Sequence, residues 1–277
     1  MAITPLNVIG AILLGMAGAV LSGMFGIGGA SVTTPGLRMF LGASPAIALG
    51  TTLPAAIPTA AAGGITYGRH GLVDWYVAAY VCATGMIGAV FGALLTKWLN
   101  LHYLMIITGF IVLYVAITTI VRGARGTEAT PVDSEVASSG EEAGEEAEAA
   151  PPRHNPWLVS AIGLVTGFYS GLLGVGGGVV MVPCFIYLLK IPIKKSIGTS
   201  LIGITAIAIP GTIVHAFLHH ISWPLFLFLI IGVIPGAYIG ARITIRVGER
   251  LIFVLFGSAL ACFGVVFIVN EIISLAK

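Results

Sequence analysis

The stretch SGLLGVGGGVVMVP at residues 170–183 decides the fold of this chain, because the chain contains it twice. Its counterpart is SGMFGIGGASVTTP at residues 22–35, 148 residues earlier, and 7 of the 14 paired positions are identical. Glycine at this density breaks a helix, since each one costs about 1 kcal/mol relative to alanine. Both copies lie in apolar sequence. A broken backbone at membrane depth is tolerated only where it packs in protein or lines a cavity, so both stretches are predicted to lie inside the protein.

The composition is that of a membrane protein. The 277 residues are 57% hydrophobic and 9% charged, with a mean hydropathy of +1.05, whereas soluble domains have roughly 45–50% apolar residues. We therefore expect an all-α polytopic membrane protein and no nucleic-acid partner. The three cysteines lie in apolar runs without the spacing of a metal site, and we interpret them as small buried hydrophobes. No metal or cofactor is expected.

The repeat extends well beyond the glycines, because the same shift of 148 residues aligns small and aromatic residues over more than a hundred positions without a gap. Each half is predicted to hold a glycine-broken element and three apolar segments long enough to cross roughly 30 Å of hydrocarbon. The first half comprises residues 8–42, 45–67, 75–97 and 102–121, and the second comprises 156–190, 194–216, 223–245 and 250–270. The predicted domains are a first membrane repeat at 1–125 and a second at 153–277.

Between the repeats lies an acidic linker at residues 126–152. It holds eight of the 11 acidic residues of the chain, together with many Ala, Gly, Ser and Pro residues. Too few large apolar residues remain for this segment to fold alone, so we expect a disordered, solvated tether.

The broken elements allow three topologies: each crosses the membrane once, crosses twice, or returns as a re-entrant hairpin. Both arms of the second element, about 15 and 12 residues long, are expected to be too short to span comfortably. Lys and Arg favour short cytoplasmic loops. If the broken elements are re-entrant hairpins, ten of the 13 Lys and Arg residues lie on one side of the membrane and only Arg38, Lys97 and Lys277 lie on the other. If each broken element crosses once, the best division is eight residues on one side and five on the other. We therefore predict inverted repeats, with both termini outside and the linker in the cytoplasm.

A half-helix that starts after the glycines points free N–H groups and the positive end of its dipole into the membrane centre. Two such ends without a nearby acid predict an anion site at the midplane. The alternative is that the glycines only permit tight packing and that the hydroxyls bond the carbonyl four residues earlier. The candidate substrate-binding residues are Ser22, Gly28, Gly29, Ser31, Thr51, Ser170, Gly176, Gly177, Gly178 and Thr199.

Other chemistry is poorly supported. We interpret His215, near a helix end beside His219 and His220, as an interfacial residue, with a proton relay as the alternative. The sequence has no phosphate-binding loop, dinucleotide fingerprint, paired buried carboxylates or Ser-His-Asp set, so no enzyme activity is expected.

The doubled pattern Ser-Gly-x-x-Gly-x-Gly-Gly-(Gly/Ala), ending in Pro and followed by Gly-Thr-(Thr/Ser)-Leu, resembles the sulfite exporter TauE/SafE family of membrane permeases. The resemblance spans the chain outside the linker and departs from the family at Ala30, which replaces the third glycine. It implies a secondary transporter of the cytoplasmic membrane that exports sulfur-containing anions such as sulfite, sulfonates or sulfoacetate by alternating access. An anion channel, or a carrier for a non-sulfur organic anion, is the alternative. The expected partners are a small anion and the lipid bilayer, while proton coupling and a homodimer stay open.

Overall fold

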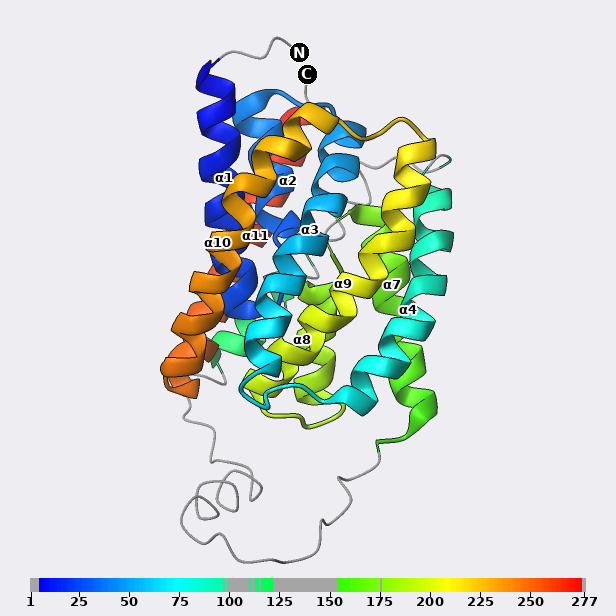
Figure 1. The fold of residues 1–277 in the computed structure, drawn as a ribbon, viewed down its shortest axis with the longest axis vertical. Coiled ribbons are helices and arrows are strands. Elements are labelled where there is room, and N and C mark those ends of the chain that lie inside the picture. The colour runs from blue at the N-terminus through cyan, green and yellow to red at the C-terminus, as the bar shows by residue number, and fades with distance from the viewer. Residues whose placement is uncertain are drawn as a thin grey trace, which may run out of the picture.

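The computed structural model describes residues 5–96, 98, 110, 113–114, 116–121, 154–174 and 176–275. In this part of the chain the protein is a bundle of helices that run along one common axis (Figure 1). The helices are α1 (Pro5–Phe25), α2 (Ala30–Leu41), α3 (Pro45–Gly68), α4 (Trp75–Leu95), α7 (Pro156–Leu173), α8 (Gly178–Tyr187), α9 (Ile193–Phe217), α10 (Trp223–Arg246) and α11 (Glu249–Leu275). The predicted linker and most of the predicted segment 102–121 lie outside the described residues.

The predicted fold class, an all-α polytopic membrane protein, is confirmed. Among the described residues, seven helices are long and apolar enough to cross a membrane. The first residues of several helices are fixed by local chemistry. Asp74 caps α4 by accepting a hydrogen bond from the Val77 N–H at 3.2 Å, and Asn155 caps α7, which has proline in its first turn.

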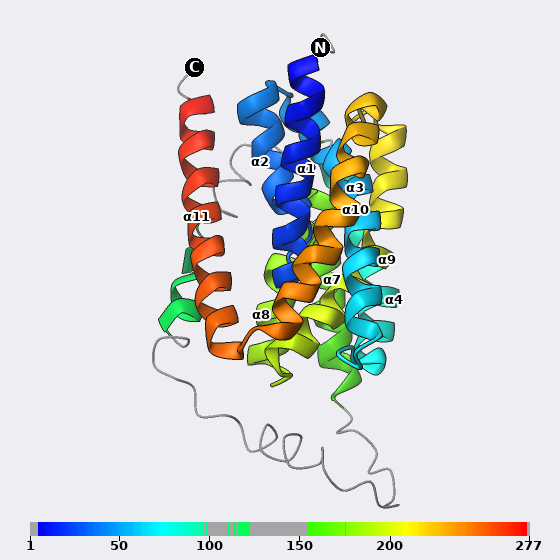
Figure 2. The ribbon, with the colours of Figure 1, turned by 60° about the vertical axis from the view of Figure 1, so that its left-hand side comes forward.

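The two glycine stretches form hairpins that enter the bundle from opposite ends. In Figure 1, α1 begins and α2 finishes at the end of the bundle where both chain termini lie. By contrast, α7 begins and α8 finishes at the other end, and the second view agrees (Figure 2). Each hairpin therefore returns to the end of the bundle from which it enters. Which end faces the cytoplasm stays a prediction.

The expectation that both arms of the second element are too short to span is wrong for its first arm, α7, and the equivalent arm of the first element, α1, is also long. Helix α1 has 21 residues and α7 has 18, and both are long enough to cross. The reason is tertiary: the two hairpins extend past each other. The tip at Gly26 lies against Ser200, and the tip at Gly174 lies against Leu49. Ser200 is about two turns from the start of α9, and Leu49 is about one turn from the start of α3, so each first arm must be long to reach its contact.

The two halves pack mainly against each other. A Cβ atom added to Gly23 of α1 would overlap the Ala237 carbonyl of α10, and one added to Gly171 of α7 would overlap the Ala89 carbonyl of α4. Adding 148 to Gly23 and subtracting 148 from Ala237 converts the first contact into the second. The residue of each contact that lies in the first half is thus replaced by its counterpart in the second half, and the reverse. A twofold axis between the halves would produce contacts related in this way. Close backbone approach through small residues is typical of helix packing in lipid.

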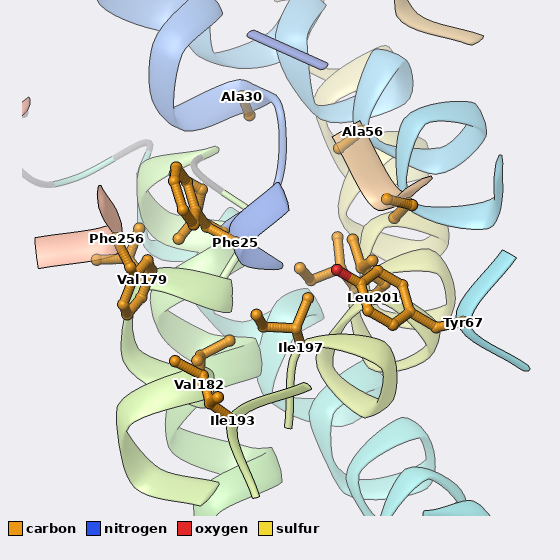
Figure 3. Close-up of a cluster of buried hydrophobic side chains, with 14 of the residues drawn as sticks. Phe25, Ala30, Ala56, Tyr67, Val179, Val182, Ile193, Ile197, Leu201 and Phe256 are labelled. Carbon is orange, nitrogen blue, oxygen red and sulfur yellow. The ribbon is translucent and has the colours of Figure 1, made fainter. Parts of the chain in front are cut away.

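A cluster of fully buried side chains fixes the tip of the first hairpin (Figure 3). The ring of Phe25, the last residue of α1, lies 5.5 Å from the ring of Phe256 in α11, measured between centroids. Ile197 and Leu201 of α9 belong to the same cluster. These contacts stabilise by dispersion rather than by removal from water, since lipid is also apolar. They hold the end of α1 against α9 and α11.

Candidate functional site

The hairpin tips require glycine because their backbone is left-handed. The φ angles are +66° at Gly26 and +78° at Gly28 in the first tip, and +61° at Gly174 and +85° at Gly176 in the second. Residues with a side chain rarely adopt these angles. The repeated glycines are therefore explained by the turn geometry that reverses each chain and starts α2 and α8.

The two tips are in direct contact. A Cβ atom added to Gly176 would lie 3.4 Å from the Gly28 Cα, and one added to Gly178 would overlap the Gly26 carbonyl oxygen. The structure thus brings the predicted glycines of both halves together. The two sides are not identical, because the residue preceding α2, Gly29, has a φ of −55°, whereas its counterpart Gly177 has a φ of +72°.

The starts of α2 and α8 supply the electrostatics of this contact. The first N–H groups of any helix lack an acceptor within the helix, and the aligned peptide dipoles place roughly half a positive charge there. Neither helix has an acidic residue in its first turn. With 12 and 10 residues, the two helices are about 15–18 Å long, and their starts adjoin the contact between the two tips inside the bundle. Such a pair of helix starts attracts an anion.

Ser22 and Ser170, which are equivalent in the repeat, carry hydroxyls that lack a hydrogen-bond partner among the described residues. Both side chains are fully buried. Other buried hydroxyls, such as those of Thr59 and Thr166, donate to the carbonyl four residues earlier. The Ser170 Cβ lies 3.2 Å from the position that a Cβ on Gly177 would occupy, so this side chain adjoins the start of α8. A buried hydroxyl without a partner costs about 1–3 kcal/mol, which a ligand can recover.

Thr51 and Thr199 already have protein partners. The Thr51 hydroxyl accepts a hydrogen bond from the Ser222 N–H at 2.9 Å, and the Thr199 hydroxyl accepts one from the Asp74 N–H at 2.8 Å. These contacts interchange under the same shift. They attach the α9–α10 loop to α3 and the α3–α4 loop to α9. Ser31 belongs to the first turn of α2, and its side chain lies outside the described part of the structure.

The hydroxyls that contact the tips are one residue further along. Ser200 donates to the Gly26 carbonyl at 3.0 Å, and Thr52 lies 3.5 Å from the Gly174 carbonyl and 2.8 Å from the Thr34 hydroxyl. One residue corresponds to about 100° of helix rotation, so Thr52 and Thr51 point in different directions. The candidate residues omitted Thr52 and Ser200, although the shift of 148 pairs them in sequence.

A further pair of equivalent residues holds the carbonyls that follow the unpartnered serines. The Tyr67 hydroxyl donates to the Gly23 carbonyl at 3.1 Å, and His215 Nε2 lies 3.1 Å from the Gly171 carbonyl. His215 is 1% exposed, so its interpretation as an interfacial residue is wrong. Its contact with Gly171 explains the difference, because α7 covers this part of α9. The sequence did contain a signal for this burial, because the shift of 148 aligns Tyr67 with His215, two large polar residues within apolar segments.

Comparisons with known proteins agree with this architecture. The family model described as "Sulfite exporter TauE/SafE" matches residues 11–267. The chain is 25% identical to the probable membrane transporter protein YunE of Bacillus subtilis, covering 87% of this chain and 88% of the relative. It is 28% identical to the probable membrane transporter protein YjnA of the same organism, over 86% and 91%, and 26% identical to a probable membrane transporter protein of Xylella fastidiosa, over 81% and 80%.

No solved structure matches the chain. The family is one of membrane transporters and not of enzymes. The match begins inside α1 and ends inside α11, so it includes both hairpin tips and the whole of α3 and α9, on which the tips rest. The chain is a multi-pass membrane protein whose relatives are named as membrane transporters, and it belongs to the sulfite exporter TauE/SafE family.

Proposed function

We propose that the protein is a secondary transporter of small sulfur-containing anions, such as sulfite, sulfonates or sulfoacetate, and that the anion binds between the two hairpin tips. The observation that carries the proposal is the pair of buried hydroxyls of Ser22 and Ser170, which lack protein partners among the described residues beside two helix starts. The relatives named as membrane transporters support the general function.

The site suits an oxyanion held by neutral donors. The oxygens of a sulfonate or sulfite would accept hydrogen bonds from the two serine hydroxyls and from N–H groups in the first turns of α2 and α8. Helices α1, α3, α4, α7 and α8 contain no Lys or Arg, and Arg38 lies in the last turn of α2. We therefore assign the binding energy to backbone and hydroxyl groups. Thr51 and Thr199 support the site through the loops that they anchor.

Alternating access is supported by the equivalence of the two ends. The Thr51–Ser222 contact at one end corresponds to the Thr199–Asp74 contact at the other. A movement that weakens one contact while keeping the other would open the site to one side at a time. The hairpins enter from opposite ends, so each end has its own movable element.

The direct test is exchange of labelled anions by the purified protein in proteoliposomes. We expect saturable exchange of sulfoacetate, sulfite or methanesulfonate, with weaker exchange of acetate and succinate. The variant with both Ser22→Ala and Ser170→Ala should lose affinity, while Thr199→Val should keep it in the folded fraction. Exchange of carboxylates alone would indicate an organic-anion carrier. Currents far above carrier turnover would indicate a channel, and absence of exchange with every anion would refute the proposal.

A further inference from the structure

His215 and His220 form a hydrogen-bonded pair at the end of α9 where α10 begins. Their Nδ1 atoms are 3.2 Å apart, and their ring centroids are 5.4 Å apart. His215 is buried, and His220 is partly exposed in the loop between α9 and α10. The pair therefore connects the outer end of the bundle to the Gly171 carbonyl, one residue from Ser170.

The contacts fix where the hydrogens lie in the neutral pair. A carbonyl can only accept, so His215 Nε2 carries the hydrogen that is donated to Gly171. A neutral imidazole has one hydrogen, so His215 Nδ1 accepts the bond that His220 Nδ1–H donates. The free lone pair of the system is then on Nε2 of His220, the more exposed ring.

No carboxylate or ammonium group competes for this role in the surrounding helices. Helices α3, α4, α7 and α8 contain no Asp, Glu, Lys or Arg. The charged residues of α9 and α10 lie at the opposite end of the bundle from the pair. The titratable side chains of the packing helices are tyrosines and cysteines, whose ordinary pKa values exceed about 8. They are Tyr67, Tyr76, Tyr80, Cys82, Tyr169, Cys184 and Tyr187.

We propose that the His215–His220 pair is the proton-binding site of the transporter and that the proton travels with the anion. This inference rests on the function proposed above. A proton from solvent binds His220 Nε2, and the proton on His220 Nδ1 passes to His215 Nδ1. The sum is one proton gained, with His220 neutral again and His215 positively charged. The charge then lies beside Gly171 at the end of α7, where it attracts an anion held by Ser170. When the site opens to the opposite side, His215 returns this proton to the solvent there and the anion leaves with it.

The coupling would exist in one half only. The residues equivalent to His215 and His220 are Tyr67 and Leu72, which the shift of 148 places at the opposite end of the bundle. Tyr67 makes the corresponding bond to Gly23 but cannot take up a proton near neutral pH. Proton and anion moving together would drive the anion away from the acidic side. An acidic exterior would then favour uptake, in contrast to the export that the family name suggests.

The test uses sulfoacetate in proteoliposomes with the membrane potential clamped by potassium and valinomycin. Both acidic groups of sulfoacetate stay ionised above about pH 6, so any coupled proton must be carried by the protein. With about pH 6 outside and pH 8 inside, one proton per anion can support up to about 100-fold accumulation, tenfold per pH unit. The variants His215→Gln and His220→Gln should abolish this accumulation but retain measurable exchange at equal pH, because glutamine preserves a hydrogen-bond donor. His219→Asn, which alters the adjacent histidine outside the pair, should keep the accumulation.

A second measurement follows proton binding by the His215–His220 pair in the absence of any anion. In protein labelled with ¹⁵N-histidine, the imidazole nitrogens of His215 and His220 should titrate together, and His220→Gln should shift the titration of His215. Three results would each show that the inference is wrong. They are a wild-type accumulation that does not depend on the pH difference, accumulation of anion by both glutamine variants, and no proton uptake by either histidine between about pH 5 and 8. Absence of exchange with all tested anions would instead refute the proposed function, and the nitrogen titration would still decide proton binding.

Discussion

Ser22 and Ser170 differ from the buried hydroxyl residues that form hydrogen bonds in the effect that loss of the oxygen should have. Their hydroxyls lack partners in the described residues, whereas the Thr199 hydroxyl accepts the Asp74 N–H at 2.8 Å. Removing an unpartnered buried hydroxyl relieves a desolvation cost, while removing a bonded one leaves its partner unsatisfied. Stability and anion binding should therefore respond in opposite ways at these two kinds of site.

We predict that Ser170→Ala leaves the thermal unfolding midpoint unchanged or raises it, and lowers anion affinity by about 2- to 10-fold, equivalent to about 0.5–1.5 kcal/mol. Thr199→Val should do the reverse, lowering stability by about 1–3 kcal/mol with unchanged affinity in the folded protein. Differential scanning fluorimetry and equilibrium binding of labelled sulfoacetate measure both quantities. Equal loss of stability in the two variants would contradict this division of roles.

His220 gives stability a defined dependence on pH. Burial lowers the pKa of its imidazole below the ordinary value of 6.5, so the unfolded chain binds the proton more readily. The stabilisation is complete above pH 6.5 and is lost as the pH falls toward the lower folded-state pKa. The unfolding midpoint in detergent should decrease across this interval and should decrease less in His220→Gln. The same acid sensitivity in both proteins would show that another group is responsible.

At this scale the sequence was sufficient for the glycines and insufficient for the hydroxyls. The helix breaks around Gly28 and Gly176 follow from the density and repetition of glycine, whereas the left-handed φ angles at these positions are known only from the structure. Whether Thr51 or Thr52 contacts the tip depends on the rotation of α3 about its own axis. That rotation is set by packing against α9 and α10 and leaves no local signal in an apolar helix with hydroxyls at adjacent positions.

At the scale of elements, the stability of the bundle depends on glycine contacts between α1 and α10 and between α4 and α7. We predict that Gly23→Ala lowers stability by about 1–3 kcal/mol or more, because the new methyl group would overlap the Ala237 carbonyl. Gly10→Ala, in the same helix, should be neutral or stabilising by about 0.5–1 kcal/mol, since nothing lies within 4 Å of the added atom. Thermal unfolding of the two variants in one detergent compares them, and similar midpoints would count against the packing.

The first and last residues of helices were predicted well for the single apolar segments outside the hairpins. The predicted segments 45–67 and 223–245 correspond to α3 (Pro45–Gly68) and α10 (Trp223–Arg246). The hairpin arms were predicted less well. The position of the glycines fixes where a helix breaks, but the depth that a tip reaches depends on how far it passes the opposing tip. That overlap, seen at Gly26 and Gly174, is a tertiary property.

For the whole molecule, the unequal distribution of Lys and Arg predicts that the acidic linker faces the cytoplasm and both termini face outward. A cysteine introduced at Ser138, with Cys82, Cys184 and Cys262 replaced by serine, should react with an impermeant maleimide only after the cells are opened. The cysteine-free protein is the control. Labelling of intact cells would show that the linker faces outward instead. The His215–His220 pair and the Asp74–Lys195 ion pair lie at opposite ends of the bundle, so the first would then face the cytoplasm and the second the exterior.

The exchange of packing partners between the halves has a consequence for biosynthesis. Helix α1 leaves the ribosome about 200 residues before α10 (Trp223–Arg246), yet α10 supplies the surface that covers the glycine face of α1. Until then α1 can face only lipid or the insertion machinery. A truncated product that stops before α10 would expose this face permanently, and membrane quality control could recognise it. Insertion of α10, rather than insertion of α1 itself, would therefore be the step that commits α1 to its native packing.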